Sequence, residues 1–506
     1  MKIKTKYSLL TLCILVFNIQ LKAALRPNAL FCDHAILQRN SSVPVWGKDT
    51  PHQKVTVSFA GQNKSCLTDA NGNWMVNLDA LEASFEGKTM RIKGSTETVI
   101  TDILIGEIWL CMGQSNMALP AKSVQKVNDI ISKIKHIRSF EVKRSVALEE
   151  QENVSGMWEV NYPNSAVACS FAYELQQKIN VPVGIILSCW GSSAIEAWMP
   201  KDMAKQFPYY DMVLHELWNN STSMQRIKEA VKAGEWDKGT DVFLRRNVNI
   251  PYNAMIHPLI PYACKGIVWY QGERNSKVYD KMPESPQFLR TIGMKRYGEV
   301  LQAFVKRYRQ AWDKQDLAFM VVQLPGFAKN LNTRESIDAE SPTEPMSWAW
   351  MREAQQQVLS LENTYLATAI DLGEKENVHP KDKYPIGERL ALLARKGVYG
   401  EDILSQGPYY KSMEVNKNQL TISFEYAEGL KTKDGEAPKG FWIAGKDKQW
   451  HKATAKIKGN SVILTATAVK EPIACRYAFA GKPEVNLINK AALPAYPFRT
   501  DNWRKE

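Results

Sequence analysis

The stretch GEIWLCMGQSNMALP, residues 106–120, changes abruptly from an apolar segment to a polar turn that presents Ser115. The apolar part has the composition of a buried strand, and Gly113 permits a tight turn directly after it. A serine at such a place is either the N-cap of the next helix or a nucleophile. Gln114 and Asn116 beside Ser115 favour the nucleophile, and further evidence comes from matching residues elsewhere in the chain.

Four later segments have the same composition, and helical patterns near 170–178, 297–309 and 351–360 lie among them. Alternation of buried strands and helices predicts an α/β fold with a parallel sheet and helices on both faces. The four segments are VPVGIILS (181–188), KGIVWYQG (265–272), AFMVVQLPG (318–326) and TYLATAIDLG (364–373).

The regions on either side of this α/β pattern are of a different kind. Residues 24–104 show short β segments and the turn DANGN, which predicts an N-terminal β-sandwich-like domain. Residues 403–506 repeat that style and predict a C-terminal β domain. We therefore expect the central domain to span 105–402, with a helical insertion at about 201–250.

The N-terminus carries three lysines followed by the apolar run YSLLTLCILVF (7–17). This pattern is typical of a signal peptide, here residues 1–23, and predicts a secreted or periplasmic protein. No later segment reaches about 20 apolar residues, so no membrane insertion is expected.

Charge and cysteine usage exclude some classes of function. Removing residues 1–23 takes away four lysines and no acid, so the formal charge falls from +12 to +8. The basic residues are scattered among acids, which argues against nucleic-acid binding. The sequence contains no CxxC spacing, so the cysteines do not indicate a metal site. Buried thiols are the default for the seven remaining cysteines, although a Cys32–Cys66 bridge stays open.

Polar residues follow four of the five predicted strands. They are GQSNM (113–117), SCWGSSAIEAW (188–198), QGERN (271–275) and DLGEKENVHP (371–380). Because ligands bind at the carboxyl ends of parallel strands, these segments are expected to meet at one edge of the sheet. His379 follows the last strand and is the favoured base for Ser115, whereas His257 is expected to be structural. This pairing favours the nucleophile interpretation of Ser115.

These motifs, together with ILQRNSSVPVWG (36–47), DANGNW (69–74) and FRTDNW (498–503), resemble the SGNH hydrolase superfamily. The resemblance is closer to the sialate O-acetylesterase-like carbohydrate esterases, and it spans nearly the whole mature chain. It implies that Ser115 is the nucleophile, that His379 is the general base, and that the oxyanion is held by the N–H groups of Ser115 and Gly191 and the side-chain amide of Asn275.

The resemblance also implies a set of residues that bind substrate or support the site, and core packing is the alternative for the two tryptophans among them. These residues are Gln114, Glu196, Trp198, Trp269, Gln271 and Glu273. Two positions depart from the family pattern. Glu376 stands where many SGNH enzymes have aspartate, and Ser192 stands where relatives often have a second glycine. The acid that orients His379 is therefore Asp371 or Glu376, or the enzyme works as a Ser-His dyad.

The resemblance implies a carbohydrate O-acetylesterase that removes acetyl groups from sugar hydroxyls through a serine acetyl-enzyme intermediate, with no metal or cofactor. The expected partner is an O-acetylated sugar, either a sialic acid or an acetylated polysaccharide. The alternative is a non-catalytic secreted glycan-binding protein built on an esterase scaffold.

Overall fold

Six parallel strands form the middle of the structure, a computed structural model that describes residues 24–279 and 292–503. The expected signal peptide, residues 1–23, lies outside the described residues. In spatial order the strands are β9 (Ile137–Glu141), β11 (Val183–Cys189), β8 (Glu97–Gly113), β12 (Gly266–Tyr270), β13 (Ala318–Gln323) and β14 (Thr364–Thr368).

The five predicted apolar runs are β8, β11, β12, β13 and β14, so the predicted α/β fold class is confirmed. The sequence did not reveal β9 or the short antiparallel edge strand β10 (Trp158–Glu159). The reason is visible in β9, which carries Arg138 and Ser139 and so lacks a continuous apolar run. The first of the five predicted strands, β8, lies between the second and the third, β11 and β12.

Helices cover both faces of this sheet. Trp109 of β8 contacts Phe171 edge to face, whereas Trp269 of β12 packs against Phe304. The register aligns Trp269 with Met112, so the two tryptophans point to opposite faces. The helices are α2 (Ala166–Ile179), packed on α10 (Tyr384–Gly397), and α8 (Met294–Ala311), packed on α9 (Ala349–Gln356).

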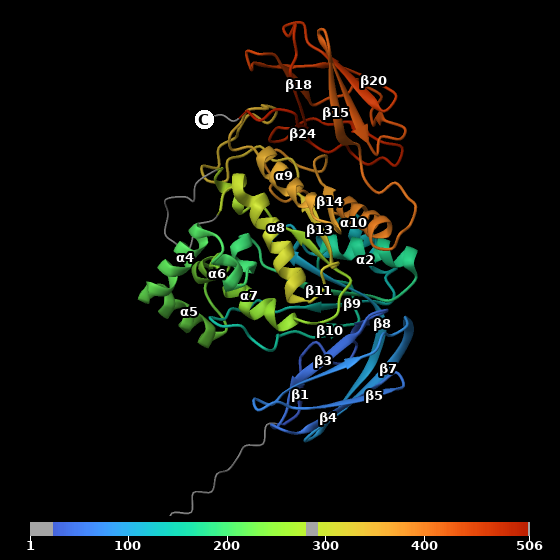
Figure 1. The fold of residues 1–506 in the computed structure, drawn as a ribbon, viewed down its shortest axis with the longest axis vertical. Coiled ribbons are helices and arrows are strands. Elements are labelled where there is room, and N and C mark those ends of the chain that lie inside the picture. Colours follow the sequence, from blue (N-terminus) through green and yellow to red (C-terminus); the bar gives the residue numbers. More distant parts are fainter. Residues whose placement is uncertain (1–23, 280–291, 504–506) are drawn as a thin grey trace, which may run out of the picture.

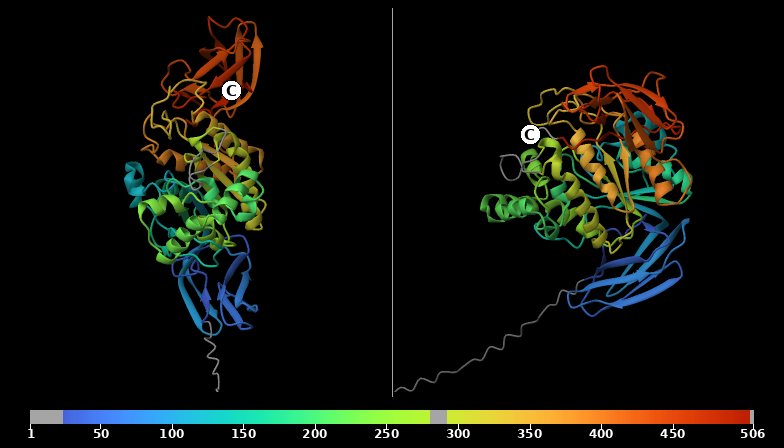
Figure 2. Two further views of the ribbon diagram at one scale, coloured as in Figure 1. Left: turned by 90° about the vertical axis from the view of Figure 1, so that its left-hand side faces the viewer. Right: turned by 45° about the horizontal axis from the view of Figure 1, so that its top comes forward.

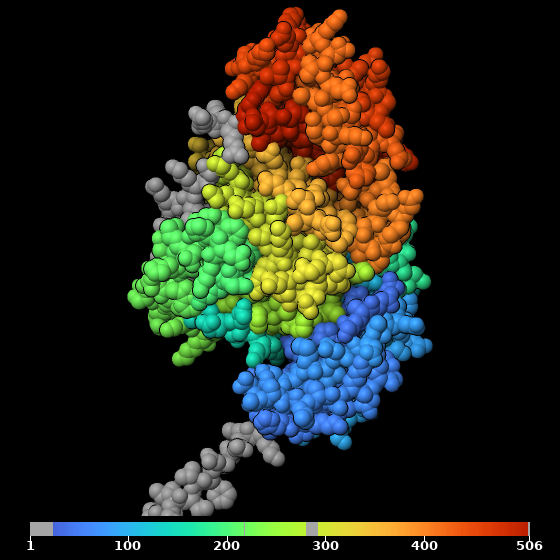
Figure 3. All heavy atoms as spheres, in the orientation of Figure 1, coloured from blue at the N-terminus to red at the C-terminus, as the bar shows by residue number. Residues whose placement is uncertain are grey.

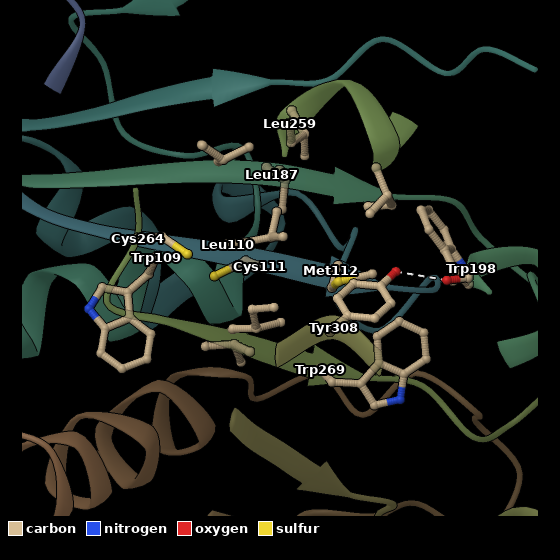
Figure 4. Packing of buried hydrophobic residues seen from close by; sticks show 14 of the residues in the cluster. Trp109, Leu110, Cys111, Met112, Leu187, Trp198, Leu259, Cys264, Trp269 and Tyr308 are labelled. Carbon is tan, nitrogen blue, oxygen red and sulfur yellow. Dashed lines mark hydrogen bonds between the residues drawn. The ribbon is translucent and has the colours of Figure 1, made fainter. Parts of the chain in front are cut away.

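The interior between the sheet and α8 is filled by large side chains (Figure 4). Trp198 and Trp269 are both fully buried there. The hydroxyl of Tyr308 on α8 donates a 2.7 Å hydrogen bond to the carbonyl of Trp198. This bond fastens α8 to the segment that follows β11.

Strand β8 belongs to two parts of the molecule. Its 17 residues run unbroken through position 104, where a domain boundary was expected. Its first half pairs with β7 (Ser84–Lys93) and with β2 (Ile36–Gln38), and its second half pairs with β11 and β12. A single hydrophobic core accordingly extends from the N-terminal strands into the central sheet.

The rest of the N-terminal region consists of two small β layers at one end of the molecule (Figure 1). One layer contains β1 (Arg26–Pro27), β3 (Val43–Lys48) and β6 (Asn73–Leu78). The other joins β4 (Lys54–Phe59) and β5 (Gln62–Leu67) to β7.

The C-terminal region is a second β structure at the opposite end, as the turned views also show (Figure 2). It has a separate hydrophobic core. One sheet contains β15 (Tyr409–Asn416), β16 (Gln419–Glu425), β21 (Ser461–Thr465) and β20 (Thr454–Lys458). Another contains β19 (Trp450–Lys452), β18 (Phe441–Ala444), β22 (Ala474–Tyr477) and β24 (Phe498–Arg499), and β17 (Lys431–Thr432) pairs with β23 (Leu487–Ile488).

Between β11 and β12 the chain forms a run of helices on one side of the molecule (Figure 3). They are α3 (Lys201–Ala204), α4 (Pro208–Asn219), α5 (Ser221–Ala233), α6 (Lys238–Leu244) and α7 (Ile250–Met255). Among the described residues, no helix is long and apolar enough to cross a membrane. All cysteines among the described residues are free thiols, and these include Cys32 and Cys66.

Candidate active site

The turn after β8 places Ser115 at the carboxyl edge of the sheet. Gly113 has a φ of 140°, and a Cβ there would lie 2.1 Å from the carbonyl oxygen of Tyr270. Only glycine fits this close approach to β12. The amides of Met117 and Ala118 then donate to the carbonyl of Gln114, at 2.9 and 3.0 Å, and close the turn around Ser115.

The helix-cap interpretation of Ser115 does not agree with the structure. The next helical segment is a 3₁₀ turn, Ala121–Ser123, whose N-cap is Pro120. The side chain of Ser115 instead lies 2.8 Å from His379, measured from Oγ to Nε2. Both residues are half-buried. A hydroxyl and an imidazole at this distance have the geometry of a nucleophile and its base.

His379 lies in the loop between β14 and α10. Burial and the nearby charge of Lys383 lower the pKa of His379 below its ordinary value. The neutral imidazole is therefore favoured, with Nε2 facing the hydroxyl of Ser115. Within residues 24–279 and 292–503, Nδ1 of His379 makes no hydrogen bond.

The two acids considered for orienting His379 are paired with other residues. Asp371 accepts two hydrogen bonds from the guanidinium of Arg389, at 2.8 and 2.7 Å. Glu376 is an exposed residue whose carboxylate lies 3.4 Å from the ammonium of Lys329. The structure thus places neither carboxylate on the imidazole. Glu374 shapes the loop instead, because it accepts a 3.0 Å bond from the amide of Lys381.

Two backbone N–H groups at the site have no hydrogen-bond partner among the described residues. In the part of the chain that the structure describes, the amides of Ser115 and Gly191 donate no hydrogen bond. The two residues are in contact, since a Cβ built on Gly191 would lie 3.5 Å from Cβ of Ser115. Unused donors beside a nucleophile are what an oxyanion hole requires.

Ser192, the departure from the family pattern, has a left-handed backbone with a φ of 60°. A β-carbon is disfavoured in this conformation, and a glycine would adopt it without strain. Arg246 holds the residue here, because its guanidinium donates to Oγ of Ser192 at 2.9 Å and to the Ser192 carbonyl at 3.4 Å.

Asn275 lies deeper than expected for an oxyanion donor. Its Nδ2 donates to the carboxylate of Glu196 at 3.0 Å and to the carbonyl of Ile292 at 3.2 Å. Its Oδ1 accepts from the amide of Ile195 at 3.1 Å and from the side chain of Gln271 at 2.8 Å. Both N–H groups of the side-chain amide are therefore already hydrogen-bonded. The side chain connects the turns that lie beneath Ser115.

The residues expected to bind substrate or to support the site are also interior, with between 0 and 3 % of each exposed: Gln114, Glu196, Trp198, Trp269, Gln271 and Glu273. Gln271 illustrates their role, since it donates to Gln114 at 3.1 Å and accepts from Tyr297 at 2.7 Å. The indole N–H of Trp198 donates to Ser193 at 2.8 Å, and that of Trp269 donates to Tyr297 at 3.2 Å. These side chains support the site from behind rather than line a cleft.

Three polar residues that the structure places at the site had no predicted role of their own. Arg246 comes from the helical insertion, and Asn116 and Lys383 form a buried hydrogen bond of 2.5 Å. One signal was available: Asn116 directly follows Ser115, and Lys383 directly precedes the helix after His379.

A cleft of about 540 Å³ opens beside the Ser115 turn, between Ala118 and Cys189. Acidic and basic side chains line its other walls, among them Glu141, Arg144 and Glu159. Across residues 24–279 and 292–503, no group of three or more His, Cys, Asp or Glu side chains is placed to hold a metal ion.

Comparison with known proteins identifies the family to which the chain belongs. Residues 105–394 match the family model described as carbohydrate esterase, sialic acid-specific acetylesterase. The sialate O-acetylesterase of Mus musculus is 24% identical over 449 residues, which cover 79% of this chain and 78% of the mouse protein. The sialate O-acetylesterase of Homo sapiens is 23% identical over 515 residues, covering 92% and 90%.

A solved structure agrees over the full length. A carbohydrate acetylesterase from Xanthomonas citri superposes with a TM-score of 0.79 and is 32% identical, covering 94% of this chain and 100% of that one. The fold and these similarities define a carbohydrate esterase, an enzyme that removes acetyl groups from sugars. The chain belongs to the carbohydrate esterase, sialic acid-specific acetylesterase family. The glycan-binding alternative is not favoured.

Proposed function

We propose that this enzyme releases acetate from O-acetylated sugars with Ser115 as nucleophile and His379 as general base. The observation that carries the proposal is the 2.8 Å separation between Oγ of Ser115 and Nε2 of His379. The imidazole is favoured in its neutral form, which is the form that can accept a proton.

The reaction proceeds in two halves. Oγ of Ser115 attacks the acetyl carbonyl carbon while its proton moves to Nε2 of His379, and the carbonyl oxygen becomes an oxyanion. The free N–H groups of Ser115 and Gly191 stabilise that oxyanion. Collapse breaks the ester bond, and the departing sugar oxygen takes the proton from His379. Water then attacks the acetyl carbon while its proton moves to Nε2 of His379. Collapse breaks the bond between the acetyl carbon and Oγ of Ser115, acetate leaves, and the proton returns from His379 to Oγ.

We assign the chemistry to a Ser-His dyad. The pairing of Asp371 with Arg389 and of Glu376 with Lys329 supports this assignment. So does the absence of a partner for Nδ1 of His379 in the described residues. The turn that supplies the Gly191 amide is braced from behind by the buried amide of Asn275.

We further propose that the sugar carries a carboxylate, as a sialic acid does. The printed names of the mouse and human relatives support this choice. The structure adds Arg246, whose guanidinium bonds Ser192 next to the oxyanion turn. Burial and the charges of Arg274 and Arg245 lower the pKa of Arg246 to about 9 although the charge of Asp241 opposes this shift, so the group lacks full anionic compensation. A substrate carboxylate would supply that compensation.

The test of the nucleophile is acetate release from an O-acetylated sialic acid and from p-nitrophenyl acetate by the wild type and by Ser115→Ala. We expect the variant to lose both activities. The wild type, quenched during turnover, should carry one acetyl group on the peptide that contains Ser115. Equal activity of the two proteins would disprove the assignment.

Arg246→Gln tests the class of substrate. We expect KM for an O-acetylated sialic acid to rise about tenfold or more, the value of a lost charge-assisted hydrogen bond, with p-nitrophenyl acetate hydrolysis unchanged. Faster hydrolysis of acetylated xylan than of sialate esters by the wild type would point to the hemicellulose alternative.

We also propose that residues 1–23 are removed on export, as the lysines and apolar run of that segment indicate. Expression of the full chain in a bacterium, fractionation and N-terminal sequencing provide the test. A cytoplasmic product that retains Met1 would contradict it.

A further inference from the structure

A single buried amide joins the segments that carry the two reacting residues. Asn116 directly follows Ser115, and its Nδ2 donates a 3.0 Å hydrogen bond to the carbonyl of Val378, which directly precedes His379. The same Nδ2 donates to the carboxylate of Glu273, and Oδ1 of Asn116 accepts from Nζ of Lys383 at 2.5 Å. Asn116 thereby ties together the ends of β8, β12 and β14.

Lys383 occupies an electrostatically unfavourable place. It is fully buried and is the N-cap residue of α10, where the helix dipole disfavours a cation. Burial lowers the pKa of Lys383 to about 7, and burial raises the pKa of Glu273 to about 7. Both groups bond Asn116 rather than each other, and buried ionisable groups of this kind seldom add stability over apolar side chains of similar volume. A role other than stability is the simpler explanation for its presence.

The titratable groups near Lys383 come from two segments, the turn after β12 and the loop after β14. Glu273 follows β12, Glu374 and His379 belong to the loop after β14, and Asp382 precedes Lys383 in the chain. The ring of Tyr270, at the end of β12, lies 5.6 Å from Nζ. Burial and the charge of Lys383 lower the pKa of His379, so Lys383 acts on His379 as a cation.

We propose that Glu273, Asn116 and Lys383 form a positioning network for the catalytic pair: Asn116 fixes the His379 loop against the Ser115 turn, and the ammonium of Lys383 disfavours protonation of His379. The inference rests on the proposed function of Ser115 and His379 and adds what sets their geometry and charge. Lys383 does not touch the ester. It acts through the base.

The lowered pKa of His379 supports this role, because its two causes are burial and the charge of Lys383. An imidazole that resists protonation remains a base at lower pH. Removal of the cation should therefore raise the pKa of His379 and move the acidic limb of the rate profile to higher pH.

The primary experiment compares kcat/KM against pH for p-nitrophenyl acetate in the wild type, in Lys383→Met and in the double variant Lys383→Met/Glu273→Gln. The double variant removes both buried charges, so it avoids an unpaired Glu273 and guards against misfolding. We expect the acidic limb to lie at higher pH in both variants than in the wild type. Lys381→Met, which changes an exposed lysine of the same loop, should leave the limb where it is.

A second readout follows His379 itself. The imidazole signals in an NMR titration, assigned with His379→Asn, should show a higher pKa in the folded double variant than in the wild type. Asn116→Ala tests the other half of the network. Loss of the bond to Val378 should lower kcat about 100-fold, the usual cost of a catalytic group displaced by about 1 Å, with little change in KM.

An unshifted acidic limb and an unshifted His379 titration in the folded double variant would overturn the electrostatic part. Full kcat in a folded Asn116→Ala would overturn the clamp. These results are distinct from failure of the proposed function, which would appear as retained activity in Ser115→Ala.

Discussion

Oγ of Ser115 and Nε2 of His379 lie 2.8 Å apart although 264 residues separate them in the chain. Two strands bring them together. Ser115 follows β8 in the middle of the sheet and His379 follows β14 at its edge, and parallel strands deliver their carboxyl ends to the same side. The bond between the Asn116 side chain and the Val378 carbonyl closes the remaining gap.

The acidic limb of kcat/KM should lie below pH 6.5, the ordinary pKa of histidine. His379 must be neutral to accept the proton of Ser115, and burial together with the Lys383 charge lowers its pKa. Activity is therefore lost only when the pH falls through this lowered pKa. A pH series with p-nitrophenyl acetate measures the limb. A midpoint at or above 6.5 would contradict the lowered pKa.

Asp371→Asn and Glu376→Gln should have different effects. Asp371 forms a two-point ion pair with Arg389 that joins the end of β14 to α10. Its loss should lower the free energy of unfolding by about 1.5–3 kcal/mol, the value of hydrogen bonds to a charged group. Glu376 is exposed beside Lys329, so Glu376→Gln should retain wild-type stability and kcat. Urea unfolding and initial rates check both. A large loss of kcat in a fully folded Glu376→Gln would argue against the dyad.

Asn275→Ala should act mainly on stability. The substitution removes one of the donors to the buried carboxylate of Glu196, which keeps the amide of Ile292, and it leaves the amide of Ile195 without its acceptor. We expect the free energy of unfolding to fall by about 1–3 kcal/mol or more. Asn128→Ala, at an exposed position of the helix Gln125–Ile131, is the matched control and should unfold like the wild type. An unchanged stability with a 100-fold lower kcat would instead assign Asn275 to the oxyanion.

Ser192→Gly should be more stable than Ser192→Ala by about 1 kcal/mol. Both variants remove the hydroxyl that Arg246 contacts, so they differ only in the β-carbon. That β-carbon is strained at a φ of 60°, where glycine is not. Thermal unfolding of the pair measures the difference. Equal melting temperatures would show that the backbone relaxes to a negative φ.

Much of the fold was predictable because continuous apolar runs identify buried strands. The meeting of Ser115 with His379 followed from one rule about strand ends. The edge strand β9 was missed because Arg138 and Ser139 interrupt its apolar pattern. The roles of Asn116 and Lys383 were not predicted for another reason. A single buried polar residue has no pattern in sequence, and its role depends on partners from distant segments.

Trp198 and Trp269 show a further limit of sequence. Tryptophan lines sugar-binding clefts and also fills cores, and the residues next to it do not distinguish these uses. In the structure both rings are enclosed between the sheet and α8 (Figure 4). Asn275 is a similar case. Its amide side chain suggested a donor to the oxyanion, but the sequence does not show that its N–H groups already bond other residues.

The continuity of β8 has a consequence for synthesis on the ribosome. The strand is made early, yet its partners in the central sheet, β11 and β12, begin at Val183 and Gly266. The partners of its N-terminal half, β7 and β2, precede it in the chain, so they are available for pairing as soon as β8 is made. During synthesis the apolar C-terminal half of β8, which leads to Ser115, therefore follows a half that is already paired. It stays unpaired until β11 and β12 have been made.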